Sequence, residues 1–288
     1  MSRKLLFAAP MLLLFAAGCS PTSSDVTRPI VGNTVIPVQT PVSTTTPVSP
    51  PVTQPATTTT AVTTTTSTAQ VGAFTFVDQT IKEDGKTLAF DITYPQMSGA
   101  ADAAMQKQFN QIVYEKNIRD QVAQMRTDNA NAVKEGMMTS AAWSLDLGGG
   151  VTYQSPRLIN VFLDGSQDTG GAHPNAYYEN VLFDPSLKKE ILVSDLFTDA
   201  SSSLQLLATW TRAELKKNTD MLEVTDPDWM AGGTDPTQSN YQFSHLTADG
   251  LVVLFPPYQV AAYVAGPQEI TIPWEKVNPL LKAEYQKK

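Results

Sequence analysis

The stretch from Ser20 to about Gln70 consists mainly of threonine, proline, serine and valine, and it contains the run TTTTAVTTTT. Such a segment cannot bury enough apolar surface to offset the entropy of ordering it, and its prolines remove N–H donors that a sheet needs. We therefore predict a disordered tether over residues 19–70, with ends roughly 40 Å apart for a flexible coil of about fifty residues. Folding is then confined to residues 71–288, which is enough chain for one domain.

The N-terminus has the layout of a secretory signal, because a short basic start is followed by an apolar run from Leu5 to Ala17. The small residues before Cys19 resemble a bacterial lipobox, although Ala16 stands where most lipoboxes carry leucine. We predict a lipoprotein signal peptide over residues 1–18 and lipidation of Cys19, with an ordinary cleaved signal as the alternative. Several acyl chains would anchor the protein stably to a membrane of the cell envelope. In a two-membrane bacterium, Ser20 lacks the aspartate retention signal, which indicates the outer membrane and periplasm.

Charge and cysteine content exclude several classes of function. Acidic residues outnumber basic ones by 28 to 20, which gives a net charge of −8 and a field that repels nucleic acid. Because Cys19 is the single cysteine, the chain can form no internal disulfide and no thiolate metal cluster. We predict no nucleic-acid partner and no cofactor.

The first part of residues 71–288 reads as a hairpin followed by a helix. Phe74 to Asp78 and Leu88 to Tyr94 have strand patterns, and we expect Pro95 to end the second strand. From Ala100 to about Glu135 the period is helical, with two apolar faces out of phase: Met105, Phe109, Ile112 and Val113 on one, and Ile118, Val122, Met125 and Val133 on the other. A bend near residues 115–117, or burial of the helix on two sides, would explain the change of phase.

Short strands and turns follow the helix. We expect strands at Ala142 to Leu147, Val151 to Tyr153, Leu158 to Asp164, Tyr177 to Phe183, Glu190 to Val193, Leu251 to Phe255 and Glu269 to Ile272. Gly148-Gly149-Gly150 should interrupt the first two as a turn or bulge, because no P-loop lysine follows. A helix capped by Asp199 or the following serines should run to about Leu215, and Trp274 to Gln286 should form a closing helix.

The loop from Thr219 to Asn240 is rich in aspartate, glycine and proline. A calcium site is one interpretation, but the spacing lacks the EF-hand order and its terminal glutamate. We therefore favour a solvated acidic loop and predict no metal site.

The segment TGGAHPN, from Thr169 to Asn175, is the most distinctive turn in the chain. Its glycines permit positive φ, and the proline biases His173 toward an extended backbone, so we expect a single defined shape. A ligand-binding turn and a structural corner are both compatible with this pattern. Our candidate ligand-binding residues are Gly170, Gly171, His173, Asn175 and Tyr177, with Tyr178, Trp229 and Tyr241 as neighbouring aromatic residues.

Common catalytic constellations are absent from the sequence. It contains no GxSxG elbow and no HExxH motif, and its two histidines are His173 and His245. Paired-carboxylate chemistry stays open because the acidic residues offer many pairs. We predict no catalytic residues and a protein that is not an enzyme.

Three segments carry a family resemblance: TGGAHPN, then VLFDPSLKKEILVSDLF, then HLTADGLVVLFPPYQVAAYVAGPQEITIP. In this order they resemble the PdaC/RsiV-like domain, which combines domains of unknown function 4163 and 3298 and occurs in lysozyme-sensing anti-sigma factors and peptidoglycan deacetylases. The resemblance implies an α+β fold with helices on an antiparallel sheet, over residues 71–288. It also implies binding at the cell envelope, to lysozyme in one case.

The departures from that family limit what carries over. The anti-sigma relative has a transmembrane helix where this chain has a lipobox, and the deacetylase holds its zinc chemistry in a separate C-terminal domain that we do not find here. We predict a lipid-anchored envelope protein with a non-catalytic binding domain for peptidoglycan or a secreted protein such as lysozyme. The alternatives are a peptidoglycan-acting hydrolase and a structural envelope lipoprotein.

Overall fold

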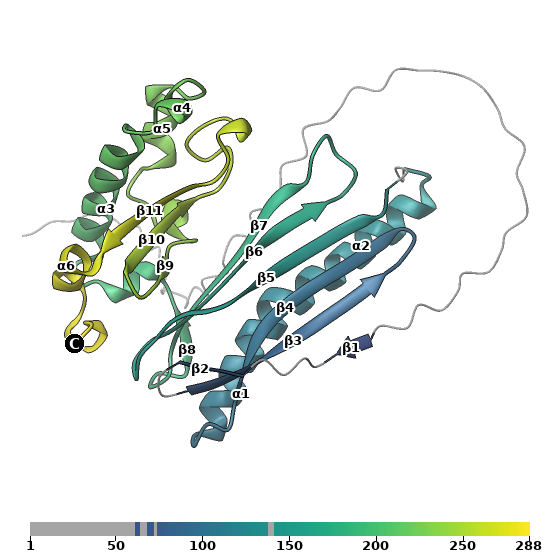
Figure 1. Ribbon diagram of the computed structural model, residues 1–288, viewed down its shortest axis with the longest axis horizontal. Coiled ribbons are helices and arrows are strands. Elements are labelled where there is room, and N and C mark those ends of the chain that lie inside the picture. Colours follow the sequence, from purple (N-terminus) through teal and green to yellow (C-terminus); the bar gives the residue numbers. More distant parts are fainter. Residues whose placement is uncertain (1–60, 64–67, 72–73, 138–140) are drawn as a thin grey trace, which may run out of the picture. The chain divides into compact units, whose positions relative to one another are not determined.

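The computed structural model describes residues 61–63, 68–71, 74–137 and 141–288, which all belong to one compact unit. The predicted signal peptide, Cys19 and most of the predicted tether lie outside these residues. The described part contains an eight-stranded sheet, a three-stranded sheet and packed helices (Figure 1). The predicted α+β class is therefore confirmed.

The large sheet has the strand order β1-β3-β4-β5-β6-β7-β8, and β2 also pairs with β3. All its pairs are antiparallel except β4 with β5, which are parallel because a long helical connection returns the chain to the same end. Both β1 and β2 pair with β3. β1 lies inside the range 19–70 that we predict to be a tether. The boundary between tether and domain at residue 70 stays a prediction. The strands are β1 Ala61–Thr63, β2 Thr68–Val71, β3 Phe74–Asp84, β4 Leu88–Ser98, β5 Trp143–Gln154, β6 Ile159–Asp168, β7 Asn175–Asp184 and β8 Lys189–Ile191.

The predicted hairpin is β3 and β4, but Pro95 does not end its second strand. Residue 95 pairs with Asp78, and the strand continues for three more residues. The backbone N–H and C=O of Met97 face the side chain of Asn110, at 2.7 and 3.0 Å, and so point away from β3. Because backbone direction repeats every second residue, the nitrogen of Pro95 also points away from β3. β5 pairs with β4 only as far as Ile92, so no ladder bond is lost at the proline.

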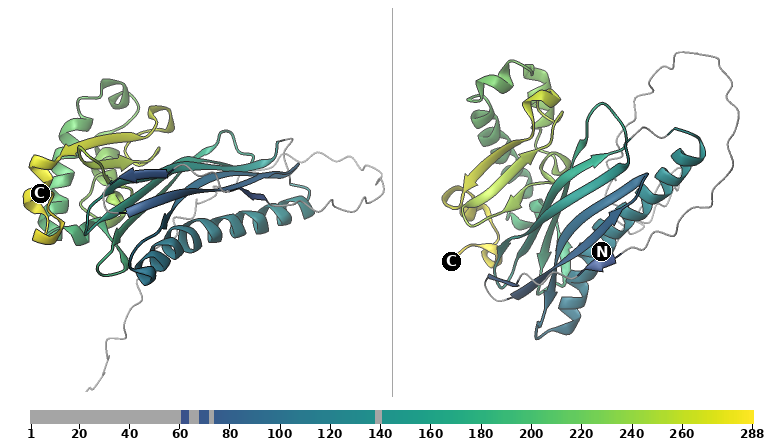
Figure 2. Two further views of the ribbon diagram at one scale, coloured as in Figure 1. Left: turned by 60° about the horizontal axis from the view of Figure 1, so that its bottom comes forward. Right: turned by 45° about the vertical axis from the view of Figure 1, so that its right-hand side comes forward.

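The long helical connection consists of α1 Ala103–Gln111, a π-helix η1 Ile112–Arg119 and α2 Asp120–Lys134. Asp102 caps α1 by accepting a hydrogen bond from the N–H of Met105 at 2.9 Å. The wider π turn explains the two apolar faces, because buried Val113 and Ile118 are five residues apart instead of three or four. The helix packs along one face of the large sheet (Figure 2), where it covers a core that includes Phe90, Ile92 and Phe183.

The glycine run lies inside β5 and does not interrupt it. Gly149 has φ of 137°, and a Cβ atom there would lie 2.3 Å from the carbonyl oxygen of Phe162. The bulge in this strand comes later, between Val151 and Tyr153. The prediction of two separate strands was therefore wrong, because glycine allows β5 to continue past this close approach.

The rest of the chain builds the three-stranded sheet, of order β11-β10-β9, and the helices around it. Asp199 caps α3, as predicted, by accepting a hydrogen bond from the N–H of Ser202 at 3.1 Å. The predicted closing helix was wrong: only Trp274–Val277 is α-helical, because Pro279 lacks an N–H and disfavours helical geometry at Asn278. The elements are η2 Val193–Leu196, α3 Ala200–Leu215, α4 Thr219–Leu222, α5 Pro227–Gly233, η3 Gln238–Tyr241, β9 His245–Leu246, β10 Gly250–Phe255, η4 Tyr263–Ala265, β11 Gln268–Pro273, α6 Trp274–Val277, η5 Asn278–Leu280 and η6 Ala283–Tyr285.

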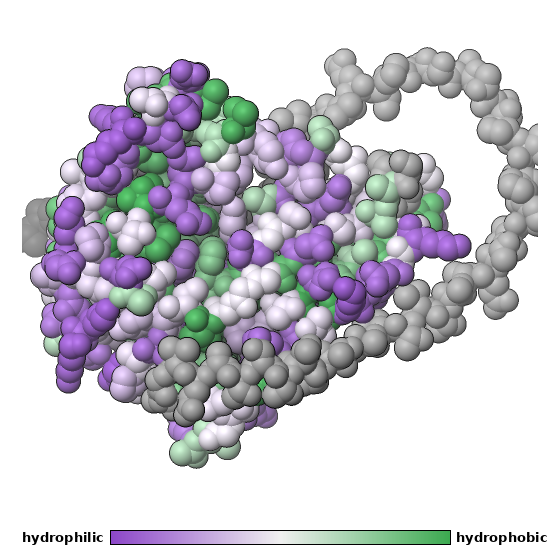
Figure 3. Space-filling model, viewed as in Figure 1, coloured by the Kyte–Doolittle hydropathy of each residue, from purple (hydrophilic) through white to green (hydrophobic). Residues whose placement is uncertain are grey.

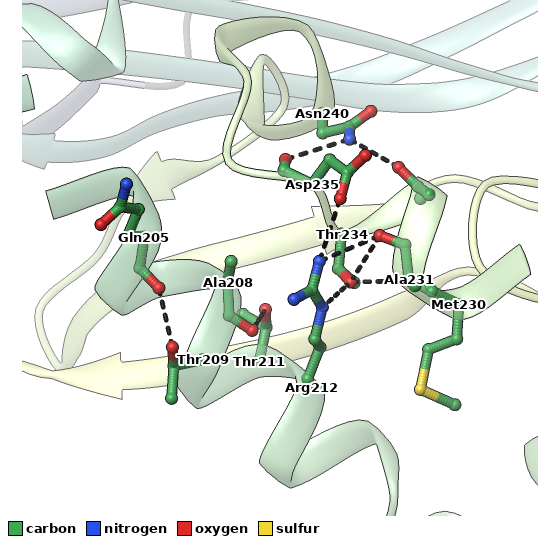
Figure 4. Close-up of polar contacts among 12 residues, drawn as sticks. Gln205, Ala208, Thr209, Thr211, Arg212, Met230, Ala231, Thr234, Asp235 and Asn240 are labelled. Carbon is green, nitrogen blue, oxygen red and sulfur yellow. Dashed lines mark hydrogen bonds and ion pairs between the residues drawn. The ribbon is translucent and has the colours of Figure 1, made fainter. Parts of the chain in front are cut away.

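The acidic segment from residue 219 to 240 is not an open loop. Asp226 caps α5, and Asp235 accepts a hydrogen bond from Arg212 at 3.2 Å. Figure 4 shows the Arg212 guanidinium reaching across from α3 to Thr234, Asp235 and the carbonyl of Ala231. These aspartates therefore have structural partners, and Arg212 ties the segment to α3.

Two buried asparagines join the large sheet to the C-terminal elements. Asn160 on β6 donates to the side chain of Asn180 on β7 at 2.7 Å and accepts from the N–H of Leu246 on β9 at 2.6 Å. Asn180 in turn donates to the carbonyl of Ser244 at 2.7 Å. One hydrophobic core lies on each side of β6 and β7, and both asparagine side chains are on the side of the C-terminal elements.

Candidate functional site

The TGGAHPN turn connects β6 to β7, as the sequence predicts. Gly170 has φ of 83°, and its N–H donates to the side chain of Asp168 at 2.8 Å. A side chain at Gly170 would be strained by this backbone angle, whereas one at Gly171 would meet little, since its nearest atom would be the carbonyl of His173 at 3.8 Å. The first glycine therefore sets the turn.

His173 lies against the connection between β10 and β11. Its ring stacks on Tyr263, with centroids 3.7 Å apart and 21° between the planes. The Tyr263 hydroxyl donates to the carbonyl of Pro174 at 2.8 Å, so the turn is fixed by both a ring contact and a hydrogen bond. Segments about ninety residues apart in sequence are thus joined at one surface.

Tyr258 extends this surface. Its ring is 5.5 Å from that of Tyr263, and 55% of the residue is exposed. Its φ of 70° is unusual for an aromatic residue, and Trp229 stabilises the position by donating from its indole N–H to the carbonyl of Tyr258 at 3.0 Å. We call His173, Trp229, Tyr258 and Tyr263 the aromatic platform. Residues held in such strained backbone conformations cluster at active sites and ligand clamps.

The hydrogen bond of His173 determines the tautomer of its neutral ring. Its Nδ1 lies 2.9 Å from the carbonyl oxygen of Pro174, which can only accept. In the neutral ring Nδ1 therefore carries the proton, and Nε2 is an acceptor. The platform thus offers aromatic faces together with one hydrogen-bond acceptor, a combination that suits a hydroxyl-bearing ligand or a mixed protein surface.

The other predicted site residues take different positions. Asn175 begins β7 opposite Gln167, and Tyr177 packs against the core on the helix side, with its hydroxyl donating to Glu179 at 3.0 Å. Tyr178 projects to the opposite side, where its ring lies 5.6 Å from Phe243. Tyr241 is fully buried and donates to the carbonyl of Thr234 at 3.0 Å, so its suggested role in surface contact was wrong.

The second histidine is an interior residue. His245 is 7% exposed and stacks on Phe162 with centroids 3.9 Å apart. Burial lowers its pKa, an effect that the hydrogen bond to the carbonyl of Phe243 and the charge of Asp164 partly oppose. Within the described residues the recorded hydrogen-bond partner of each histidine ring is a backbone carbonyl, so neither ring is paired with a serine or threonine nucleophile.

A second buried polar cluster surrounds Asp184. Its carboxylate accepts hydrogen bonds from Ser186, from the Tyr285 hydroxyl at 2.8 Å and from Arg157 at 3.0 Å. Burial alone would raise the pKa of Asp184, but these donors and the N–H of Leu187 lower it below its ordinary value. Burial, with the bond to Asp184, raises the pKa of Tyr285 to about 12. All the partners are internal, so the cluster fastens η6 to β7.

Residues 74–137 and 141–288, with the two short strands before them, contain no group of three or more histidine, cysteine or acidic residues placed to hold a metal ion. The same residues include no helix with the length and hydropathy of a membrane span.

The face of the large sheet away from α1 and α2 is turned to the viewer in Figure 3, where pale and purple residues predominate.

Comparison with known proteins gives two family matches. Residues 81–176 match the family described as "Deacetylase PdaC", and residues 194–275 match "Protein of unknown function (DUF3298)". The first ends at Ala176, the second residue of β7, and so contains His173, and the second contains the other three platform residues. These matches point to a cell-envelope-related domain.

Individual relatives are distant. The peptidoglycan-N-acetylmuramic acid deacetylase PdaC of Bacillus subtilis is 25% identical over 211 residues, which cover 72% of this chain and 42% of that protein. The chain thus spans less than half the length of that relative. The immunogenic protein MPT64 of Mycobacterium tuberculosis is 28% identical over 58% of this chain and 72% of its own length. An esterase of the same organism is 24% identical over 74% of this chain and 85% of its own.

Sequence reasoning missed Tyr258 and Tyr263 as site residues. Both lie in PPYQVAAY, which reads as a connection between strands. Tyr258 had one local signal, its place directly after two prolines, which fix the backbone of the approaching chain. Their contact with His173 depends on tertiary structure, so no local pattern could reveal it.

Proposed function

We propose that this chain is a lipid-anchored cell-envelope protein whose domain binds peptidoglycan or a secreted protein such as lysozyme without catalysing a reaction. Cys19 would carry the lipid, and residues 19–70 would let the domain reach beyond the membrane. Similarity to the PdaC and DUF3298 families supports the envelope location. The aromatic platform is the proposed contact surface.

One observation carries this proposal. The platform holds exposed Tyr258 in a left-handed backbone conformation while its neighbours are fixed by stacking and hydrogen bonds. A rigid ring loses little conformational entropy on binding, which makes aromatic residues effective contacts for sugars and proteins. Val264, the residue after Tyr263, is also exposed, at 79%.

Binding to purified sacculi and to lysozyme tests the proposal. The Tyr258→Asn variant removes the ring and keeps a residue that tolerates left-handed geometry, so the fold should survive. We expect at least tenfold weaker binding of whichever ligand is retained, the usual effect of removing a central aromatic contact. Val133→Ala is the matched control, because Val133 is also exposed (46%) but lies on α2. Failure of the unaltered protein to bind either ligand would refute the proposal.

A peptidoglycan-acting hydrolase is the second candidate, because relatives are named a deacetylase and an esterase. Incubation with sacculi should release soluble fragments, acetate or free amino groups if this candidate is right. The same assay with the His173→Ala variant tests the histidine of the platform. Turnover that depends on His173 would replace the binding proposal with an enzymatic one.

A further inference from the structure

β11 is an edge strand of the three-stranded sheet, and β10 is its strand partner within the described residues. Its residues alternate strictly between buried and exposed positions, with Gln268, Ile270 and Ile272 buried. Glu269 and Thr271 are exposed. The edge of this strand therefore has a regular extended geometry over six residues.

The direction of the free backbone groups follows from the ladder. The carbonyl of Gly250 accepts from the N–H of Thr247 at 2.8 Å and so faces β9. Alternation turns the backbone groups of Leu251 and Val253 toward β11, where they meet Ile272 and Ile270. The N–H and C=O groups of Glu269 and Thr271 therefore face away from the sheet, and no hydrogen bond to them is recorded within the described part of the chain.

A groove of about 290 Å³ runs between this edge and the end of α3. Its lining residues are Glu214, Leu215, Asn218, Gln268, Glu269, Ile270 and Thr271. Asn218 donates to the side chain of Gln268 at 2.9 Å, which fixes one wall against the other. Figure 1 shows α3 beside β11. An edge strand next to a helix is a geometry in which an extended peptide can add as a further strand.

We propose that this groove binds an extended segment of a partner protein that carries lysine or arginine and adds as a strand to β11. The two outward residues offer two donors and two acceptors, which only another extended backbone matches in spacing. Glu214 and Glu269 make the lining acidic, although Lys217 pairs with Glu214 at 2.7 Å. A second copy of this chain fits less well, because it would bring Glu269 toward acidic groups of its own kind.

The edge also has features that limit indiscriminate pairing. Glu269 places a charge on the strand, and Pro273 ends it without a donor, both of which natural edges use against aggregation. A partner strand must place a positive charge next to the Glu269 carboxylate to pair with β11 along its whole length. The charge thus acts as the specificity element of the proposed site.

The probe is a blocked hexapeptide of alternating threonine and lysine, titrated into the isotopically labelled chain and followed by NMR. We expect the amides of Glu269 and Thr271 to shift and to exchange more slowly with solvent. The Thr271→Pro variant removes an outward N–H without touching the β10 ladder and should weaken binding at least tenfold. Thr271→Val retains the N–H and should bind as the unaltered chain does.

A second variant keeps the test decisive if Thr271→Pro does not fold. Glu269→Lys should lose the lysine peptide and bind a peptide with glutamate in place of lysine. No binding at millimolar peptide, or equal binding by Thr271→Pro, would overturn the proposal. A dimer that Thr271→Pro dissociates would instead assign the edge to a second copy. This outcome is independent of sacculus or lysozyme binding, because the aromatic platform is left intact.

Discussion

Replacing Asn160 with leucine should expose how strongly the buried amide network holds the large sheet to the C-terminal elements. The side chain is fully buried, and its amide group serves Asn180, the carbonyls of Val161 and Val181, and the N–H of Leu246. Leucine has a similar volume, so the cavity term is small. What is lost is the set of hydrogen bonds.

The magnitude follows from the groups left without partners. The backbone N–H of Leu246 and the side-chain amide oxygen of Asn180 would both stay buried without a partner. Each such group costs about 1–3 kcal/mol of stability. The expected loss is about 2–6 kcal/mol, a large share of the roughly 5–15 kcal/mol that stabilises a typical domain. At about 2–4 °C per kcal/mol for a domain of this size, the melting temperature should fall by roughly 5–20 °C.

Urea denaturation followed by circular dichroism measures the change, and hydrogen exchange at the Leu246 amide locates it. Asn131→Ala is the control, because Asn131 is an exposed residue of α2 and its replacement should change stability by less than about 0.5 kcal/mol. The double variant with Asn180→Leu should cost less than the sum of the single changes. A loss below about 1 kcal/mol for Asn160→Leu would refute the reasoning.

Three further changes test other parts of the structure. Gly149→Ala should destabilise the fold by about 1–3 kcal/mol, because its φ is 137° and its Cβ would meet a carbonyl. A Cβ atom at Gly150 would meet nothing within 4 Å, so Gly150→Ala should be neutral or stabilising by up to about 1 kcal/mol. Equal shifts of the melting temperature for the two variants would contradict this. The Asp184 pKa lies below its ordinary value of 3.8, so its stabilisation is complete above about pH 5 and is lost as the pH falls through 3.8 and then through the lowered value. Asp184→Asn should therefore be less stable at pH 7, with a difference that shrinks in acid denaturation series below pH 4. Burial lowers the pKa of His245 from 6.5, so stability should decline as the pH falls below about 6.5, and His245→Phe should remove that decline in urea titrations from pH 5 to 8.

Local patterns predicted the elements whose causes are local. The period of two in residues 88–94, the Asp199 cap and the glycines of the β6–β7 turn each determine the backbone near them. The errors came from neighbours distant in sequence. Pro95 continues a strand because β5 has diverged from β4 by that point, and Asp235 is held by Arg212 on α3.

The candidate site shows the same division. The sequence identified His173 because its turn is unusual, but Tyr258 and Tyr263 become its neighbours only when the β10–β11 connection folds against the β6–β7 turn. Tyr177 and Tyr178 illustrate the period of a strand: adjacent in sequence, they project to opposite sides of the sheet. The sequence could identify the turn, but not the surface to which it contributes.

The π-helix between α1 and α2 limits which changes in length the chain can accept. A π turn holds about one residue more than an α turn, so deleting one residue from Ile112–Arg119 would favour an ordinary α-helix there and would change the phase of α2 little. A deletion within Asp120–Gln124, where the helix is already α-helical, would instead turn Met125, Asn129 and Ala132 by about 100° and move them away from the sheet. A one-residue deletion should therefore be tolerated better within Ile112–Arg119 than within the first turns of α2. The wider π turns let the apolar residues of α1 and those of α2 face the same side of the sheet, although their spacing in the sequence does not fit one continuous α-helix.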